Sequence, residues 1–215
     1  MKKKRQAHVR LAVGLLSSFA LWTVLVRFVD VRSIGPMGSS VGFAELNGFV
    51  HKLTGVHTSI YTLTDWLGLI PIAVALGFGV LGLVQWIKRK RFLAVDRSIL
   101  ALGVFYVVVM AVYVFFEHVV INYRPILING TLEASYPSST TVLAACVMPT
   151  AAMQFCARVK NAWIVRCVIS VTVTFTAFMV IGRLFSGVHW VTDIIGGVLL
   201  SGGLVTAYAA VCRAK

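Results

Sequence analysis

Long apolar runs separated by short polar stretches dominate the pattern of this chain. Six of these runs approach the roughly 20 residues that an α-helix needs to cross the hydrocarbon core of a bilayer. Strict alternation of apolar and polar residues is not seen in them, so helices are the predicted spanning elements. We therefore predict an all-α integral membrane protein, a six-transmembrane-helix bundle that forms one domain over residues 1–215. The predicted spans are 9–29, 66–87, 98–119, 139–157, 163–185 and 191–212.

The connections between these spans differ in length and character. The longest one, residues 30–65, is predicted to be an outer loop. Its first part, 34–43, is rich in turn-forming residues, and 44–53 has helical periodicity, which predicts a short helix at the membrane interface. Residues 1–10 are basic and precede the first apolar run without a small-residue cleavage site. We expect a cytoplasmic basic tail and an uncleaved first helix rather than a signal peptide.

Charge predicts the orientation of the bundle. The composition is 59% hydrophobic and 13% charged, and the formal net charge is +13, with 20 Lys and Arg residues. Fifteen of these 20 fall in segments that lie inside if the N-terminus is cytoplasmic, which is the positive-inside bias of membrane proteins. We expect a protein of the plasma (inner) membrane with both termini in the cytoplasm. The basic residues would contact lipid headgroups, and no basic stripe interleaved with aromatic residues indicates a nucleic-acid partner.

The candidate chemistry lies on the predicted outer face, in two segments, residues 117–138 and 183–193. Arg124 and Arg183 carry guanidinium groups, which match the geometry of phosphate oxygens. The run Ser138-Ser139-Thr140 opens the fourth span, where unpaired N–H groups and the positive end of the helix dipole favour an anion. An outer arginine by itself is more often a headgroup anchor, and serine is a common helix cap. In combination these residues predict a phosphate site.

His189 and Asp193 follow in the second of these segments. They are four residues apart and share one helical face if the sixth span begins near residue 188. The carboxylate of Asp193 would then hold the imidazole of His189 in one tautomer and leave the other ring nitrogen free to attack. The alternatives are that Asp193 only caps a helix and that His189 only decorates the interface. No His, Cys or carboxylate cluster has metal-ligand spacing, so the sequence predicts neither a metal nor a cofactor.

Three short motifs in these segments resemble those of the type 2 phosphatidic acid phosphatase superfamily, integral-membrane lipid phosphatases related in fold to vanadium haloperoxidases. The family patterns are Lys-x6-Arg-Pro, Pro-Ser-Gly-His and Ser-Arg-x5-His-x3-Asp. The matching residues, in the same order and with Gly182 in place of Ser, are Arg124-Pro125, Pro137-Ser138, Arg183, His189 and Asp193. The resemblance covers most of the chain, because the six-span frame agrees as well as the motifs.

The resemblance implies a role for each of these residues. The phosphate would be held by Arg124, Ser138, Ser139, Thr140 and Arg183. His189, oriented by Asp193, would attack phosphorus to give a phosphohistidine, and water would then release phosphate. The resemblance implies no metal in this mechanism.

The first and second motifs depart from the family pattern in ways that matter for the chemistry. Glu117 stands seven residues before Arg124, where the family has Lys, and Ser139-Thr140 replaces Gly-His in the second motif. Thr140 therefore stands where the family places its general acid, and loss of a positioned acid typically costs about 10²–10⁴ in rate. A phosphate that leaves from a diphosphate needs this proton far less than an alkoxide does. Glu117 is either a substitute acid or an ion-pair partner of one of the arginines.

The sequence thus predicts a membrane phosphatase that acts on a lipid phosphate or diphosphate through a phosphohistidine. Undecaprenyl diphosphate is the favoured substrate if the protein is bacterial. The alternative is a catalytically silent lipid-phosphate binding protein of the same fold. A transporter or channel is disfavoured, because the ionisable residues gather at one face rather than at mid-membrane depth.

Overall fold

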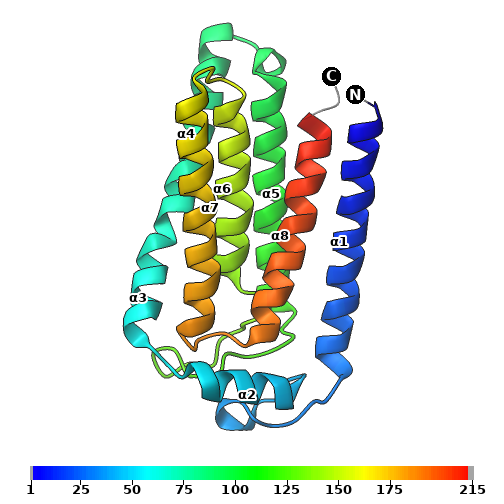
Figure 1. Cartoon of the computed structure of the whole chain (residues 1–215), viewed down its shortest axis with the longest axis vertical. Helices are drawn as coiled ribbons and strands as arrows, with labels where there is room; N and C mark the ends of the chain where they lie inside the picture. The colour runs from blue at the N-terminus through cyan, green and yellow to red at the C-terminus, as the bar shows by residue number, and fades with distance from the viewer. Residues whose placement is uncertain (1, 213–215) are drawn as a thin grey trace.

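The computed structural model describes residues 2–212, which form a single bundle of helices (Figure 1). Six spans in this part of the chain are long and apolar enough to cross a membrane, and α3 and α4 together make one of them. The predicted all-α membrane bundle with six spans is confirmed. The helices are α1 Lys2–Phe28, α2 Ala44–Thr54, α3 Thr58–Leu67, α4 Leu69–Arg89, α5 Arg97–His118, α6 Ser139–Cys156, α7 Ala162–Phe185 and α8 Val191–Cys212.

The bundle has two distinct ends. The start of α1 and the end of α8 lie at one end, which we call the terminal end (Figure 1). The connections after α1, α5 and α7 lie at the opposite end, which we call the loop end, and α2 runs crosswise there. Within the predicted basic tail, residues 2–10 form the first turns of α1, because helical residues continue without a break into the apolar run.

Helices α6 and α8 form the centre of the bundle. About half of each is buried inside the protein, whereas the other spans are mostly exposed. Helix α8 packs against α1 and α6, and α6 packs against α4 and α7 as well. α6 is the least apolar span, as expected of a helix that faces other helices rather than lipid. The core joins α5, α6 and α8 and includes Phe105, Val142, Cys146, Leu200 and Tyr208.

Glycine allows α1 and α8 to lie close together. A Cβ atom on Gly203 would lie 2.7 Å from Leu16 Cδ2, which is shorter than real Cβ contacts. Small residues at such a crossing let two backbones approach and so increase the van der Waals contact between the helices. This contact matters in a membrane, where the hydrophobic effect does not drive helices together.

The loop-end half of α1 is also hydrogen-bonded to segments near the start of α6 and α8. The indole Nε1 of Trp22 donates to the carbonyl oxygen of Thr192 at 3.1 Å. The hydroxyl groups of Thr23 and Tyr136 lie 2.7 Å apart and share a hydrogen bond. These contacts fix α1 against the part of the bundle that carries the predicted site.

The second span begins at Thr58, in α3, rather than near residue 66 as predicted. The hydrophobic pattern misses α3 because polar residues, Thr64 and Asp65 among them, interrupt it. The span bends at Gly68, one turn before Pro71, which has no N–H to continue the helical hydrogen bonds. The bend turns α3 toward α7 while α4 continues along α6.

The helix predicted over 44–53 is observed as α2. Its buried Asn47 donates to the Gly42 carbonyl oxygen at 2.7 Å and to Thr192 Oγ1 at 3.0 Å. Its opposite face, with Phe49 and Leu53, is exposed, as expected for an amphipathic helix at a membrane interface. Helix α2 is therefore attached to the start of α8 through one buried amide.

Candidate active site

The sequence-predicted site residues gather at the loop end of the bundle. Arg124 lies in the connection between α5 and α6, Ser138 caps α6, and Arg183 is in the last turn of α7. His189 lies just before α8 and Asp193 in its first turn. Segments separated by up to 70 residues thus meet in one place, and the contacts below show how.

Backbone hydrogen bonds fold the connection between α5 and α6 back on itself. The N–H of Arg124 donates to the Glu133 carbonyl oxygen at 3.0 Å, and the N–H of Ser135 donates to the Asn122 carbonyl oxygen at 2.9 Å. The Ser135 hydroxyl donates to the same Asn122 oxygen at 3.1 Å. As a result, the Arg124 side chain and the Ser135 carbonyl group both reach His189.

His189 is buried, and its two ring nitrogens have different neighbours. Nδ1 lies 3.1 Å from the Ser135 carbonyl oxygen, which can only accept, so Nδ1 carries the proton and donates it. Nε2 lies 3.4 Å from Arg124 Nη1. Burial, and then the positive charges of Arg124 and Arg183, hold the pKa of His189 well below its usual value. The imidazole is therefore neutral near pH 7, with the Nε2 lone pair facing the arginine.

Asp193 has no exposed surface and caps α8. Its Oδ2 accepts a hydrogen bond from the Trp190 N–H at 2.9 Å, and its Oδ1 accepts one from Asn122 Nδ2 at 3.4 Å. A carboxylate three residues after the helix cap that reaches back to the cap N–H is one half of a capping box. Oδ2 also lies 3.7 Å from His189 Nδ1. The predicted pair is thus adjacent, but the direct acceptor of the imidazole proton is the Ser135 carbonyl group.

Arg183 is almost completely buried, and the residues that contact its guanidinium group come from α3. Its Nη1 donates to Thr64 Oγ1 at 3.3 Å and lies 3.9 Å from Asp65 Oδ1. The guanidinium carbon lies 5.1 Å from the centre of the Tyr61 ring, within cation–π range. A Cβ atom on Gly182 would lie 2.8 Å from Thr64 Cγ2. Glycine at 182 therefore lets α3 approach α7 closely enough to surround the guanidinium.

Arg124 is held in a similar way from within its own connection. Its Nε lies 3.1 Å from Glu133 Oε2, and the carboxylate is about half exposed. Each arginine has one carboxylate neighbour, Arg124 Nη1 lies 3.4 Å from His189 Nε2, and the positive charge of Arg183 also acts on the imidazole. Two positive charges around a neutral imidazole suit an anion with several oxygens, such as phosphate.

The start of α6 faces the same place. Ser138 is buried, and its N–H donates to the Asp193 carbonyl oxygen at 3.2 Å. Among residues 2–212, the buried Ser138 Oγ and Arg183 Nε have no hydrogen-bond partner. Buried polar groups are normally paired, and a bound phosphate would provide acceptors for both. Ser139 and Thr140 carry the first free N–H groups of the helix.

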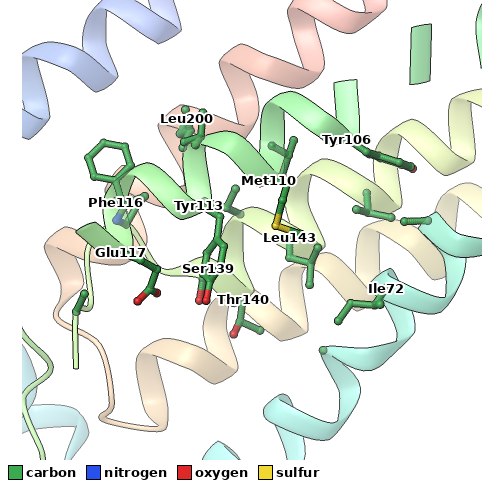
Figure 2. Close-up of a pocket in the computed structure, with 18 of the residues that line it drawn as sticks. Ile72, Tyr106, Met110, Tyr113, Phe116, Glu117, Ser139, Thr140, Leu143 and Leu200 are labelled. Atoms are coloured by element: carbon green, nitrogen blue, oxygen red, sulfur yellow. The ribbon is translucent and has the colours of Figure 1, made fainter. Parts of the chain in front are cut away.

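A cavity of about 660 Å³ extends from this cluster into the bundle between α4, α5 and α6. Its lining is mainly apolar, with polar groups at one end. Figure 2 shows Glu117, Ser139 and Thr140 gathered at that end, while Leu143 and Ile72 lie farther along. His189 also lines the cavity. The arrangement fits a molecule with a charged head and an apolar tail.

Glu117 lies in the last turn of α5 and lines the cavity. The ion-pair alternative predicted for it is not realised: within the described chain no Lys, Arg or His nitrogen comes within 4.0 Å of its carboxylate. The carboxylates that do pair with Arg124 and Arg183 are those of Glu133 and Asp65.

Several residues of the site were missed in the sequence. They are Thr64, Asp65, Asn122, Glu133 and Ser135. Ser135 acts through its carbonyl group, which has no sequence signal at all. Asp65 carried a weak one, since it is a carboxylate at the start of an apolar run. For metal binding, residues 2–212 contain no group of three or more His, Cys, Asp or Glu side chains arranged to hold an ion.

Comparison with known proteins gives two matches. The model of the PAP2 superfamily matches residues 98–215. Among solved structures, the first transmembrane PAP2-type phosphatidylglycerolphosphate phosphatase from Bacillus subtilis is similar, with a TM-score of 0.56 and 18% sequence identity over 95% of this chain and 99% of that one. This likeness shows a shared fold. A search of curated proteins gave no match.

Proposed function

Because the chain belongs to the PAP2 superfamily, we propose that it is a membrane phosphatase that hydrolyses a lipid phosphate or diphosphate. The observation that carries the proposal is His189, a neutral buried imidazole whose Nε2 lies 3.4 Å from Arg124 at the polar end of an apolar cavity. A neutral imidazole is a competent nucleophile, whereas its protonated form is not.

The proposed reaction has two steps. His189 Nε2 attacks phosphorus, the bond from phosphorus to the lipid oxygen breaks, and that oxygen leaves with the electron pair and takes up a proton. Water then attacks the phosphohistidine, the N–P bond breaks, and inorganic phosphate is released with the imidazole neutral again. Arg124 and Arg183 would neutralise the charge on the phosphoryl oxygens in both steps. Asp193, 3.7 Å from Nδ1, would stabilise the positive ring of the intermediate.

The cavity supports a lipid substrate rather than a small soluble ester. Its apolar lining would bury part of a hydrocarbon chain, which is favourable by roughly 25 cal/mol for each Å² of apolar surface removed from water. The finer proposal is a diphosphate of the undecaprenyl type. Thr140 cannot protonate a leaving oxygen near neutral pH, and a departing phosphate needs a proton less than a departing alkoxide does.

The proposed orientation places the terminal end in the cytoplasm and the site at the outer face of the plasma (inner) membrane. It rests on the bias of Lys and Arg toward the segments at the terminal end. A cysteine introduced at Lys52, in α2, would then react with a membrane-impermeant reagent added outside intact cells.

Purified protein in detergent would be given phosphatidic acid and an isoprenyl diphosphate, and inorganic phosphate would be measured. We expect release that His189→Ala reduces to background. His118→Ala is the matched control, since this exposed histidine bonds only the Val114 carbonyl oxygen among described residues and should keep full activity. Binding of lipid phosphate without any release by the unmodified protein would instead establish the silent binding protein.

A further inference from the structure

A lipid monophosphate, the other substrate class of the proposed function, loses its lipid oxygen as an alkoxide and so needs a proton source other than Thr140. Displacement at phosphorus places the attacking and leaving atoms roughly in line. The leaving oxygen therefore lies on the side of phosphorus away from His189 Nε2, toward the interior of the cavity that the lipid occupies. We propose that Glu117 is the general acid for this oxygen, an assignment that rests on the proposed phosphatase function.

The position of Glu117 suits this role. It lies at the polar end of the cavity, beside Ser139 and Thr140 at the start of α6 (Figure 2). The apolar lining continues along α5 to Tyr106, eleven residues away, which is about 16 Å at the rise of an α-helix. His189 and Glu117 both line this cavity. For a lipid with its phosphate at His189 and its tail along α5, the proposal places the ester oxygen between the two, on the side of Glu117.

The carboxyl group is also chemically free to act. Within the described chain it forms no ion pair, so its oxygens are available to a bound substrate. Tyr113, one turn earlier on α5, also lines the cavity. Figure 2 shows both side chains at the end of the cavity where Ser139 and Thr140 lie.

The other titratable groups that line the cavity are less suited. Asp65 is paired with Arg183 at 3.9 Å. Burial raises the pKa of Tyr136, whose hydroxyl group is already hydrogen-bonded to Thr23. Tyr106 lies deep in the apolar part. Besides Glu117, only Tyr113 remains as a candidate at the polar end, and the test below separates the two.

The proton balance of both steps is complete with one carboxyl group. In the first step the Glu117 carboxyl proton passes to the leaving lipid oxygen as the P–O bond breaks, and Glu117 becomes a carboxylate. Water then occupies the position of the departed oxygen. In the second step the carboxylate takes one proton from this water as its oxygen bonds to phosphorus and the N–P bond breaks. Glu117 is then protonated again, with no other reactant required.

The test compares two phosphate monoesters that carry the same alkyl tail. One has an alkyl leaving group, and the other an aryl leaving group acidic enough to depart without a proton. We expect Glu117→Gln to lower kcat for the alkyl ester by about 10²–10⁴ and to change kcat for the aryl ester by less than tenfold. Retained aryl activity shows at the same time that the variant is folded.

Glu133→Gln and Tyr113→Phe are the matched controls. Glu133 is paired with Arg124, so its loss should affect both esters by the same factor. Tyr113→Phe should keep the wild-type ratio of alkyl to aryl rates; a ratio that falls with Tyr113→Phe but not with Glu117→Gln would assign the acid to Tyr113 and overturn the proposal.

Equal losses for both esters in Glu117→Gln, or no loss for either, would also overturn the assignment while leaving the phosphatase function intact. If the unmodified protein and His189→Ala are equally inactive on both esters and on an isoprenyl diphosphate, the proposed function itself fails.

Discussion

Replacing Asp193 with Asn tests how the carboxylate acts on His189. The group that fixes the imidazole tautomer is the Ser135 carbonyl oxygen, 3.1 Å from Nδ1, rather than Asp193. The substitution should therefore leave the tautomer unchanged. It removes a negative charge 3.7 Å from a ring that becomes positive when it is phosphorylated, together with the long hydrogen bond that Asp193 Oδ1 accepts from Asn122 Nδ2 at 3.4 Å. The amide oxygen of Asn can still accept the Trp190 N–H that caps α8.

The expected loss follows from Coulomb's law. Two unit charges 3.7 Å apart at an effective dielectric constant of about 20 interact by about 4.5 kcal/mol. Since each 1.36 kcal/mol corresponds to a factor of ten in rate, Asp193→Asn should lower kcat by about 10³. No discount for solvent applies, because the side chain has no exposed surface.

The assay is phosphate release at saturating isoprenyl diphosphate in detergent. Asp96→Asn, which removes a carboxylate at the terminal end, serves as the control for the change of charge. A loss of less than tenfold would refute the electrostatic role and leave Asp193 as a helix cap only. A melting temperature much below that of the unmodified protein would show instead that the amide does not support the cap.

Two further predictions concern protonation and stability. Because burial and two arginines lower the pKa of His189, its ring should stay neutral as the pH falls through about 6.5, the usual histidine value. The measurement is an NMR titration of the histidine signals, in which the signal missing from His189→Ala identifies His189. A midpoint of 6.5 or higher for that signal would contradict the prediction. Asp96 accepts hydrogen bonds from Gln85 and Arg89, both at 2.9 Å. Asp96→Asn should therefore destabilise the fold by about 1 kcal/mol, a value already discounted because the pair is partly exposed. The variant should melt about 2–4 °C lower and keep full activity.

The spans could be predicted because membrane-crossing helices are set by one variable, the length of an apolar run. The exception is α3, which carries Thr64 and Asp65 on a face that packs beside α7. A polar residue in a helix lowers its apparent hydrophobicity whether it faces lipid or protein. The pattern therefore cannot distinguish a loop from a helix whose polar face is buried, and the second span was predicted to begin too late.

The site was predictable only where chemistry belongs to side chains in a motif. Arg124, Arg183 and His189 could be picked out because they stand at positions that match the family motifs. Other groups belong to the candidate site only because the fold brings them there. The Ser135 carbonyl oxygen reaches His189 because hydrogen bonds to Asn122 fold back the connection before α6. Such proximity depends on the path of the backbone, and the path of the backbone cannot be predicted from the type of any single residue.

The family match begins at residue 98, yet three attachments join the earlier half of the chain to the later one. Thr23 holds Tyr136, Asn47 holds Thr192, and Thr64 holds Arg183. A chimera that exchanged residues 1–97 for the same region of a relative would keep every motif of this chain. It would keep the three hydrogen bonds only if the incoming half carried the same partners at the same places, so an exchange between family members has to treat each pair as one unit.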